Sequence, residues 1–462
     1  MRLRKPDPEA PGWALLTLGI ALILVLSPRI LPTQDRENHD RQNQVQGDLI
    51  TGARGPFPAA FAAEAPVEPD HVIRRTVADG DVLVHGLGIR WTESGVRAVN
   101  LRTGKEYWRY ERREAGAAAD ATSFDVSERT VVIDFRDGRV VGIDLRTGKP
   151  RWRTETEPET ETGEEERSLA EAMHGGPNGM NGMNQLNGTV SLADGQAVTE
   201  TTTATVLAVS ERDGRRLWTA KAPKSCPDVS VRTAYAFPDH LTAVLVDCDP
   251  TNPETSHELL LGVDNRTGDV LWQRPADWGN QPLRGDENTL VALDPNPLTP
   301  RAVHLLEVNR DGVSERADFS VTRGYGLAAA EGVALSNIDP EIYHLDSKTL
   351  LSAYATKNGH RMWRVRAPSG QAYGGPAIAD GRVYVVRQPI FIHVNGDGGS
   401  PARAELLVLD ADTGRLLHTL RLPGLTVPED VDLATLSVCG IGGGAVSVCW
   451  PGETQTRMIA TD

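Results

Sequence analysis

A short two-strand unit recurs at least seven times along the chain, and this repetition constrains the fold more than any other feature. Each copy reads as an alternating apolar strand, a tight turn ending in Gly, and a second strand that usually carries an aromatic residue four positions after the Gly. The clearest copy is Val141–Thr154, VGIDLRTGKPRWRT. The others span Gly95–Tyr110, Val206–Ala220, Leu260–Arg274, Val303–Phe319, Leu351–Val365 and Leu406–Leu420.

The turn glycines and the aromatic residues mark equivalent positions in the copies. A Gly at a fixed place in a hairpin is expected where the backbone needs a positive φ, which Gly adopts without steric cost. One large flat side chain on each unit is what packing between successive sheets requires. The glycines are Gly104, Gly148, Gly214, Gly268, Gly312, Gly359 and Gly414. The residues four positions later are Trp108, Trp152, Trp218, Trp272, Arg316, Trp363 and His418.

The spacing of these glycines predicts an all-β propeller. The intervals are 44, 66, 54, 44, 47 and 55 residues, mostly close to the roughly 40–50 residues of a four-stranded blade. Thr76–Gly86 is assigned to the first blade as its two inner strands. After the seventh unit, Leu436–Trp450 and Arg457–Asp462 look like the first three strands of an eighth blade. We expect a strand within Leu49–Asp70 to complete that blade, which closes an eight-bladed ring and protects its edge.

The N-terminus predicts a membrane anchor. Residues 1–10 begin with MRLRK, whose three basic side chains favour a cytoplasmic location, and an uncharged, mostly apolar run follows at Pro11–Pro28. We assign residues 11–31 to a single transmembrane signal anchor because no small-x-small cleavage pattern follows; a cleaved signal peptide is the alternative. In either case the rest of the chain lies outside the cytoplasm, with the anchored form at the cell membrane.

The remaining organisation follows from composition. Residues 32–48 have few apolar side chains and are expected to form a disordered tether. Residues 49–462 form the propeller. An insertion at 155–188 contains seven Glu between Glu155 and Glu166, then a Gly-, Asn- and Met-rich stretch, and is expected to be disordered.

The four cysteines are predicted to form two disulfides within hairpins. Cys226 and Cys248 flank one pair of strands, and Cys439 and Cys449 flank another, so each hairpin brings its two cysteines to one edge. An exported domain meets an oxidising environment in which such bonds persist. We therefore expect Cys226 to pair with Cys248 and Cys439 with Cys449.

The repeat resembles that of the pyrroloquinoline-quinone-type β-propellers. The string apolar-Asp-x-x-Thr-Gly-x-x-x-Trp stands intact at Ile143–Trp152 and Val263–Trp272, and the resemblance covers about residues 71–462. It implies the propeller fold. The family includes both quinone-dependent dehydrogenases and non-enzymatic outer-membrane assembly factor lipoproteins. The chain lacks the adjacent Cys-Cys pair of the dehydrogenases, the CxxCH haem motif and any Cys before Cys226.

Other residues with the chemistry of a site were weighed and assigned no catalytic, cofactor-binding or metal-binding role. DCDPTNPE crowds oxygen ligands without the Gly of a calcium loop, and three Met beside a His could hold a soft metal such as Cu(I). His418 has no assignable acidic or nucleophilic partner. The oxygen-ligand group consists of Asp247, Asp249, Asn252 and Glu254. The soft-metal group consists of Met173, His174, Met180 and Met183.

These observations predict a membrane-anchored, extracytoplasmic, non-enzymatic scaffold that binds a protein partner on a propeller rim. The recognisable positions are structural ones, and loops on a rigid frame are the usual place for recognition. The alternative is a divergent quinoprotein dehydrogenase that holds the quinone with calcium. With 63 Asp and Glu against 48 Lys and Arg, nucleic acid is excluded as a partner, and the oligomeric state is left open.

Overall fold

The computed structural model describes the repeat region and a short segment that precedes it. The described residues are 48–61, 72–78, 82–92, 94–113, 120–155, 190–201, 205–226, 229–248, 257–276, 278, 282–293, 301–321, 327–337, 349–389, 404–422, 436–449 and 455–461. The predicted anchor at 11–31, nearly all of the tether and all but the first residue of the insertion lie outside these ranges. Within them, no helix has the length and apolar character needed to span a membrane.

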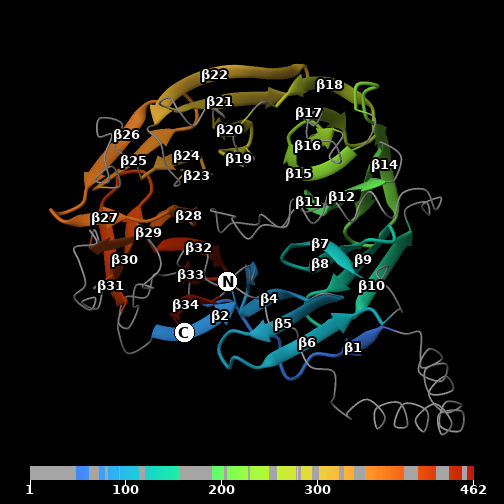
Figure 1. Ribbon diagram of the computed structural model, residues 1–462, viewed down its shortest axis with the longest axis horizontal. Coiled ribbons are helices and arrows are strands. Elements are labelled where there is room, and N and C mark those ends of the chain that lie inside the picture. Colours follow the sequence, from blue (N-terminus) through green and yellow to red (C-terminus); the bar gives the residue numbers. More distant parts are fainter. Residues whose placement is uncertain are drawn as a thin grey trace, which may run out of the picture.

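The described strands form eight antiparallel sheets arranged as the blades of a ring (Figure 1). The first strand of each blade lies innermost and the last lies at the periphery.

Blades 1 to 4 follow one another along the chain. Blade 1 contains β3 (Val82–Val84), β4 (Leu87–Thr92), β5 (Gly95–Asn100) and β6 (Glu106–Glu111). Blade 2 contains β7 (Ala121–Val126), β8 (Thr130–Phe135), β9 (Arg139–Asp144) and β10 (Pro150–Glu155). Blade 3 contains β11 (Val190–Ala193), β12 (Gln196–Thr201), β13 (Thr205–Ser210) and β14 (Arg216–Lys221). Blade 4 contains β15 (Val229–Phe237), β16 (Leu241–Cys248), β17 (His257–Asp264) and β18 (Val270–Pro275).

Blades 5 to 8 complete the ring, and the last of them draws strands from both ends of the chain. Blade 5 contains β19 (Leu283–Arg284), β20 (Thr289–Leu293), β21 (Arg301–Asn309) and β22 (Gly312–Val321). Blade 6 contains β23 (Leu327–Ala330), β24 (Val333–Ser336), β25 (Leu350–Ala355) and β26 (Arg361–Arg366). Blade 7 contains β27 (Gln371–Tyr373), β28 (Ala377–Ala379), β29 (Arg382–Pro389), β30 (Ala404–Asp410) and β31 (Leu416–Leu422). Blade 8 contains β32 (Ser437–Gly442), β33 (Ala445–Cys449), β34 (Gln455–Thr461) and β2 (Val72–Ala78).

The prediction that an N-terminal strand closes the last blade is confirmed, but the predicted segment was wrong. The closing strand is β2, which pairs with β34 from Val72 opposite Thr461 to Ala78 opposite Gln455. The segment expected to close the ring, Leu49–Asp70, instead contributes β1 (Leu49–Thr51), a fifth strand outside β6 in blade 1.

The hairpin assigned to Thr76–Gly86 was also wrong, because β2 belongs to blade 8 and β3 to blade 1. The Asp79-Gly80 dipeptide predicts a hairpin turn, because Asp-Gly is a common turn sequence between paired strands. Here it lies in the sequence between strands of two neighbouring blades.

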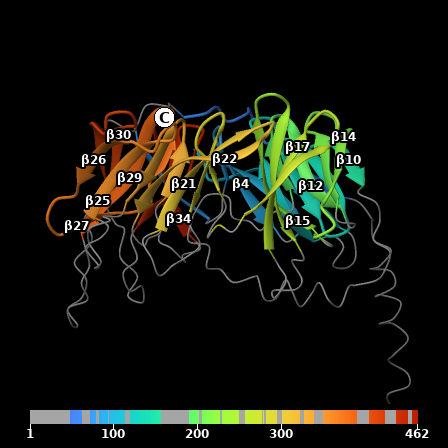
Figure 2. The same ribbon diagram turned by 90° about the horizontal axis from the view of Figure 1, so that it is seen from above.

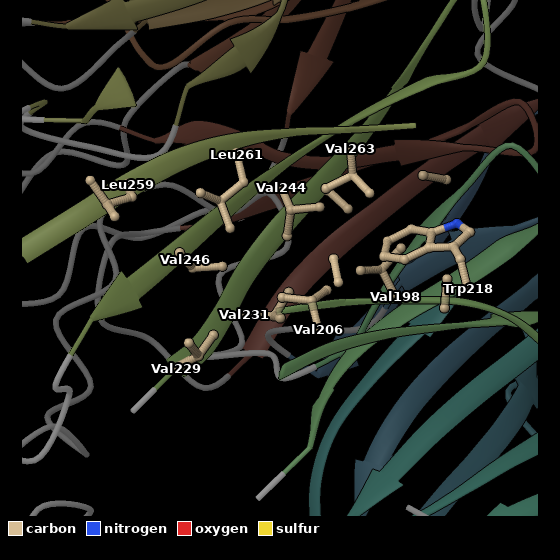
Figure 3. Close-up of a cluster of buried hydrophobic side chains, with 14 of the residues drawn as sticks. Val198, Val206, Trp218, Val229, Val231, Val244, Val246, Leu259, Leu261 and Val263 are labelled. Atoms are coloured by element: carbon tan, nitrogen blue, oxygen red, sulfur yellow. The ribbon is translucent and has the colours of Figure 1, made fainter. Parts of the chain in front are cut away.

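Buried apolar side chains between neighbouring sheets form the core. Several second strands, such as β8, β16 and β20, are buried throughout, because both faces of a blade are covered by its neighbours. Figure 3 shows the cluster between blades 3 and 4, in which Val206 and Trp218 face Val231, Val244 and Leu261. Contacts of this kind hold each blade to the next.

The repeated tryptophans join successive blades, as the sequence predicts. Trp108 Nε1 donates a hydrogen bond of 2.8 Å to Leu145 O in the turn of blade 2, and Trp152 does the same to Glu211 O in blade 3 at 2.7 Å. A Cβ placed on Gly148 would lie 2.6 Å from the Trp108 side chain. The turn glycine therefore serves two purposes: it adopts a φ of 68°, and it leaves room for the indole of the preceding blade.

Trp272 and Trp363 follow the same rule, with Nε1 donating to Asn309 O at 3.0 Å and Ala411 O at 2.7 Å. Trp218 differs, because its Nε1 donates to Gln196 Oε1 in its own blade at 2.8 Å.

Each tryptophan also lies across a small residue on the third strand of its own blade. The opposing pairs are Ala98 with Trp108, Gly142 with Trp152, Ala208 with Trp218, Gly262 with Trp272, and Ala353 with Trp363. A Cβ on Gly142 would lie 2.1 Å from the Trp152 ring, so a large side chain there displaces the indole. The small residue is thus a further part of the repeat, beyond the positions recognised from the sequence.

Replacing Gly142 is expected to destabilise the fold by an amount that depends on side-chain size. Gly142→Val should lower the free energy of unfolding by about 1–3 kcal/mol because it overpacks the site of Trp152. Gly142→Ala should cost less, since Ala98 and Ala353 already lie opposite tryptophans. Denaturant unfolding of both variants measures the difference. Equal losses for Ala and Val would show that the indole does not depend on this space.

Blade 5 departs from the pattern, and the predicted equivalence of Arg316 was wrong by one residue. The hairpin of β21 and β22 has a shorter turn, and Ala317, opposite Leu305, takes the position of the tryptophans. A Cβ on Gly359 in blade 6 would lie 3.3 Å from Ala317 Cβ, where other blades place the indole. An aromatic pair replaces the missing contact between these blades: Phe319 stacks on Tyr354 with ring centroids 4.0 Å apart.

His418 does occupy the tryptophan position in blade 7, half-buried and opposite Val408. The replacement of Trp by His is explained by the seam of the ring, which is blade 8, where strands from the two ends of the chain pair. A repeat tryptophan docks on the turn between the third and fourth strands of the next blade. In blade 8 these strands are β34 and β2, which come from opposite ends of the chain, so no such turn exists.

Candidate functional site

The topology gives the ring two unlike faces. The turn face carries the turns between first and second strands and, in blades 1 to 7, those between third and fourth strands, all of which are short. The loop face carries the connections between second and third strands and those between blades. The long connections join strand ends at the loop face, among them 156–189, 249–256, 390–403 and 423–436, with the exception of 52–71, which joins strand ends at the turn face. Figure 2 shows the ring edge-on, with the strands running between the two faces.

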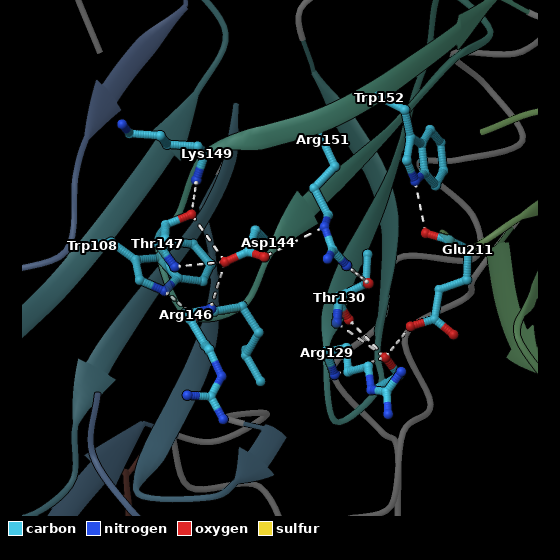
Figure 4. Close-up of polar contacts among 12 residues, drawn as sticks. Trp108, Arg129, Thr130, Asp144, Arg146, Thr147, Lys149, Arg151, Trp152 and Glu211 are labelled. Carbon is cyan, nitrogen blue, oxygen red and sulfur yellow. Dashed lines mark hydrogen bonds and ion pairs between the residues drawn. The ribbon is translucent and has the colours of Figure 1, made fainter. Parts of the chain in front are cut away.

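The Asp-x-x-Thr-Gly turns are capped by their own side chains (Figure 4). Asp144 Oδ1 accepts hydrogen bonds from the backbone N–H of Arg146 at 3.1 Å and of Thr147 at 2.9 Å, and from the Thr147 hydroxyl at 2.9 Å. In blade 7, the hydrogen bonds from Thr413 hold the pKa of Asp410 below its usual range. These carboxylates satisfy turn amides, which accounts for their recurrence without a catalytic role.

Residues 48–61 form a strap that starts at the rim of blade 1 and crosses the turn face toward blade 8. Asp48 Oδ2 anchors its beginning by accepting a hydrogen bond of 2.9 Å from the Tyr110 hydroxyl and pairing with Arg153 of blade 2. Three main-chain hydrogen bonds then link it to blades 1 and 8: Arg54 N to Tyr107 O at 2.9 Å, Gly86 N to Pro58 O at 3.2 Å, and Phe61 N to Gly443 O at 2.7 Å.

Two arginines fix the strap's aromatic side chains. The guanidinium of Arg102 lies 4.1 Å from the centre of the Phe61 ring, and that of Arg146 lies 4.5 Å from the centre of Phe57. Phe61 is 4% exposed. The strap therefore spans the seam of the ring, with Phe61 buried and Phe57 half-buried against it.

Both disulfides lie at the loop face. Cys226 is bonded to Cys248 with a Cα–Cα distance of 4.8 Å, and Cys439 is bonded to Cys449 with a Cα–Cα distance of 5.9 Å. These are the pairs that the sequence predicts. The second bond joins the first two strands of blade 8, and the first joins the end of β16 to Cys226, which precedes β15 in blade 4. The two blades lie opposite each other in the ring.

Beside the first disulfide, charged side chains are paired below the loop face. Asp247 is 4% exposed, and its Oδ2 lies 2.5 Å from Arg232 Nη2. Burial raises the pKa of the neighbouring Glu258 above its usual value; Asp247 raises it further, while Arg232 opposes the change. Asp247 is the one member of the calcium-loop candidate within the described residues, and its carboxylate is engaged by an arginine. The other members, Asp249, Asn252 and Glu254, lie outside them.

The described ranges contain no group of three or more His, Cys, Asp and Glu side chains that could hold a metal ion. The soft-metal candidates Met173, His174, Met180 and Met183 fall outside those ranges, so their prediction stays untested.

Asp125 is a half-buried titratable group that was not predicted from the sequence. It lies on the inner strand β7, and its carboxylate accepts a hydrogen bond of 2.7 Å from Leu192 N on the inner strand of blade 3, and another of 2.7 Å from Val126 N. Burial raises the pKa of Asp125 to about 6, although both hydrogen bonds lower it. The carboxylate links two blades at the channel side. Its signal in the sequence was an acidic residue in the otherwise uncharged strand ATSFDV.

This carboxylate makes a testable contribution to pH-dependent stability. Because the folded-state pKa of about 6 lies above the ordinary 3.8, the stabilisation is fully present below pH of about 4 and is lost as the pH rises through 6. Between pH 4 and 7, the stability of Asp125→Asn relative to wild type should rise by on the order of 2–3 kcal/mol. Unfolding curves across this range measure it.

Asp410→Asn is the matched control, because the pKa of Asp410 is lowered instead of raised. Its stability relative to wild type should change with pH in the opposite direction, and at lower pH. A constant difference between Asp125→Asn and wild type would contradict the assignment of a raised pKa.

The fold, the capped turns and the docked tryptophans define an eight-bladed β-propeller built from quinoprotein-type repeats. The family model described as outer membrane protein assembly factor BamB matches residues 62–175, 183–298 and 256–446. The chain belongs to this family. A search of curated proteins found no match.

Several solved structures are similar over most of the chain, each at 12% sequence identity. BamB from Moraxella catarrhalis has a TM-score of 0.44, with 84% of this chain and 98% of that chain covered. The computationally designed Ika8 protein has a TM-score of 0.45, with 88% and 100% covered. The quinohemoprotein alcohol dehydrogenase ADHIIG from Pseudomonas putida HK5 has a TM-score of 0.44, with 88% and 75% covered.

Proposed function

We propose that this protein is a non-enzymatic scaffold at the extracytoplasmic side of a membrane, which binds a protein partner through its loop face. One observation carries the proposal: apart from 52–71, which includes most of the strap, the long connections join strand ends at one face of a ring whose blades are fixed by docked tryptophans. Variable loops on a rigid frame are the usual basis of recognition. The name of the family model, an outer membrane assembly factor, supports a partner that is itself a protein.

The location rests on two further observations. Both disulfides lie at the loop face, and such bonds persist in oxidising compartments outside the cytoplasm. The apolar run within residues 11–31, with its basic flank, has the composition of a signal anchor. The proposed arrangement is a single span with the propeller outside, without a quinone or calcium.

Site-specific photocrosslinking in cells tests the partner face. A photoreactive residue in place of exposed Arg113 or Ser369 lies at the loop face, and one in place of Lys357 or Asn358 lies at the turn face. We expect discrete protein adducts from the loop-face positions and none from the turn-face positions. Adducts only from the turn face, or none from any position, would contradict the proposal.

The dehydrogenase alternative is tested separately. Purified protein supplied with pyrroloquinoline quinone and Ca²⁺ should reduce no dye with alcohols or sugars, and reproducible activity would overturn the scaffold function. The membrane location is tested by washing membranes at high pH, which should leave the protein in the pellet.

A further inference from the structure

The turn face of blades 1 to 3 carries a concentration of exposed basic side chains in a chain with a formal net charge of −15. They flank the turn glycines of three successive blades. This group, the basic arc, consists of Lys105, Arg146, Lys149, Arg212, Arg215 and Arg216, all of which are exposed. Because they occupy equivalent places in successive repeats, the side chains are presented at the same level along one edge of the ring.

Acidic groups near the arc are fewer, and several are engaged. Asp144 caps its own turn, and the Ser127 hydroxyl donates to Glu211. Glu128, Asp194 and Asp213 are exposed. The opposite half of the turn face has the reverse balance, with more exposed acids on its turns, namely Asp239, Asp269, Glu287, Asp311, Glu331, Asp380 and Asp412. The turn face is therefore polarised, basic at blades 1 to 3 and acidic at blades 4 to 7.

We propose that the basic arc docks on anionic lipid headgroups, so that the turn face of blades 1 to 3 lies against the membrane and the loop face stays accessible. This inference rests on the proposed membrane location. Lys and Arg near an anionic surface contribute additively to binding, and a level array suits a plane. The arrangement leaves the loop face free for the protein partner.

The composition of the arc favours lipid over an acidic protein. Protein interfaces depend on buried aromatic and apolar anchors with a polar rim. Among the described residues, the exposed large hydrophobic side chains are Ile50, Leu271, Met362 and Leu416, and none lies on the turns of blades 1 to 3. A surface of charge without apolar anchors matches a headgroup layer.

The strap places the point of attachment on the outer rim of the blades that carry the arc, at the loop-face end of β6, where Leu49 lies opposite Glu111. Asp48 is held by Tyr110 of blade 1 and Arg153 of blade 2, so the chain joins the ring at the rim of these blades. Residues 32–48 separate this point from the proposed anchor, and a chain of that length reaches at most about 60 Å. The blades held nearest to the membrane are thus those that carry the basic arc. Glu155, where the acidic run begins, lies at the loop-face end of β10, away from the arc.

The test uses the full chain in nanodiscs of neutral lipid or of neutral lipid with phosphatidylglycerol. A fluorophore on Thr103→Cys reports on the turn face and one on Ser369→Cys on the loop face; the native cysteines described are all in disulfides. Lipids with headgroup quenchers should quench the Thr103 probe in anionic discs at low salt, and less at high salt. The Ser369 probe should stay bright.

Charge reversal tests the arc itself. Lys149→Glu, Arg212→Glu and Arg215→Glu together should abolish the quenching and weaken cosedimentation with anionic vesicles roughly a hundredfold. The matched control is Arg266→Glu, Lys357→Glu and Arg415→Glu on blades 4, 6 and 7, which should change neither. Circular dichroism confirms that both triple variants fold.

The outcomes separate this inference from the proposed function. Retention in the disc without quenching of the Thr103 probe, or equal quenching in neutral discs, would overturn lipid docking and leave the scaffold intact. Loss of the protein from the disc would contradict the membrane location. The vesicle assay would then test by itself whether the basic arc binds anionic lipid. Binding of poly-glutamate without binding of anionic vesicles would show that the basic arc binds an acidic polypeptide and not lipid.

Discussion

Removing residues 455–462 is expected to abolish cooperative folding of the whole ring. The truncation deletes β34, which pairs with β33 on one side and with β2 on the other. Without it, β2 has no backbone partner and blade 8 keeps two strands. Because a ring is stabilised by contacts at every interface between blades, opening it exposes apolar surface on both sides of the gap. Near-ultraviolet circular dichroism during thermal unfolding should show no sharp transition.

The control for this truncation is removal of Asp462 alone, which lies beyond the end of β34. It should unfold like the intact chain. If the longer truncation unfolded at the temperature of the intact chain, the pairing of β34 with β2 would not be what closes the ring.

Trp108→Ala is expected to lower the free energy of unfolding by about 3–5 kcal/mol, the usual cost of removing a buried Trp. The indole is fully buried, lies against Gly148 of the next blade and donates to Leu145 O at 2.8 Å. Its loss leaves a cavity at the interface of blades 1 and 2 and an unpaired carbonyl oxygen. Urea unfolding measures the change.

His418→Ala provides the matched control, because His418 occupies the same repeat position without a turn to dock on. We expect it to cost less than about 1 kcal/mol, as for most substitutions away from such features. A similar loss for both variants would show that the position, and not the docking on the next blade, determines the stability.

The two predictions concern the two ways in which the ring holds together. Seven of its interfaces join consecutive blades, in most cases through an indole or an aromatic pair, while the blade at the seam is assembled from both ends of the chain. The strap adds a third connection by linking blades 1, 2 and 8 across the turn face. In the proposed function this matters because the chain is tethered at its N-terminal side, where the strap begins.

The sequence by itself determined the repeated fold. The spacing of Gly148 and its equivalents predicted the turns, because a left-handed backbone position selects Gly. The register of Trp152 and its equivalents predicted the contacts between blades, because a large flat side chain in a polar turn region needs a surface to cover it. The disulfide pairs followed from hairpin geometry, since a hairpin brings both ends of its strands together.

Only the tertiary structure decided which strands pair at the seam and which polar groups meet. Residues 49–51 and 72–78 both have the character of strands, and their local patterns do not show which blade each one joins. The shift from Arg316 to Ala317 depends on the length of one turn, which changes the register of every residue after it. Asp125 and Leu192 meet because neighbouring blades bring their inner strands together. The strap, the polarised turn face and the loop face likewise depend on residues far apart in the sequence, whose proximity no local pattern encodes.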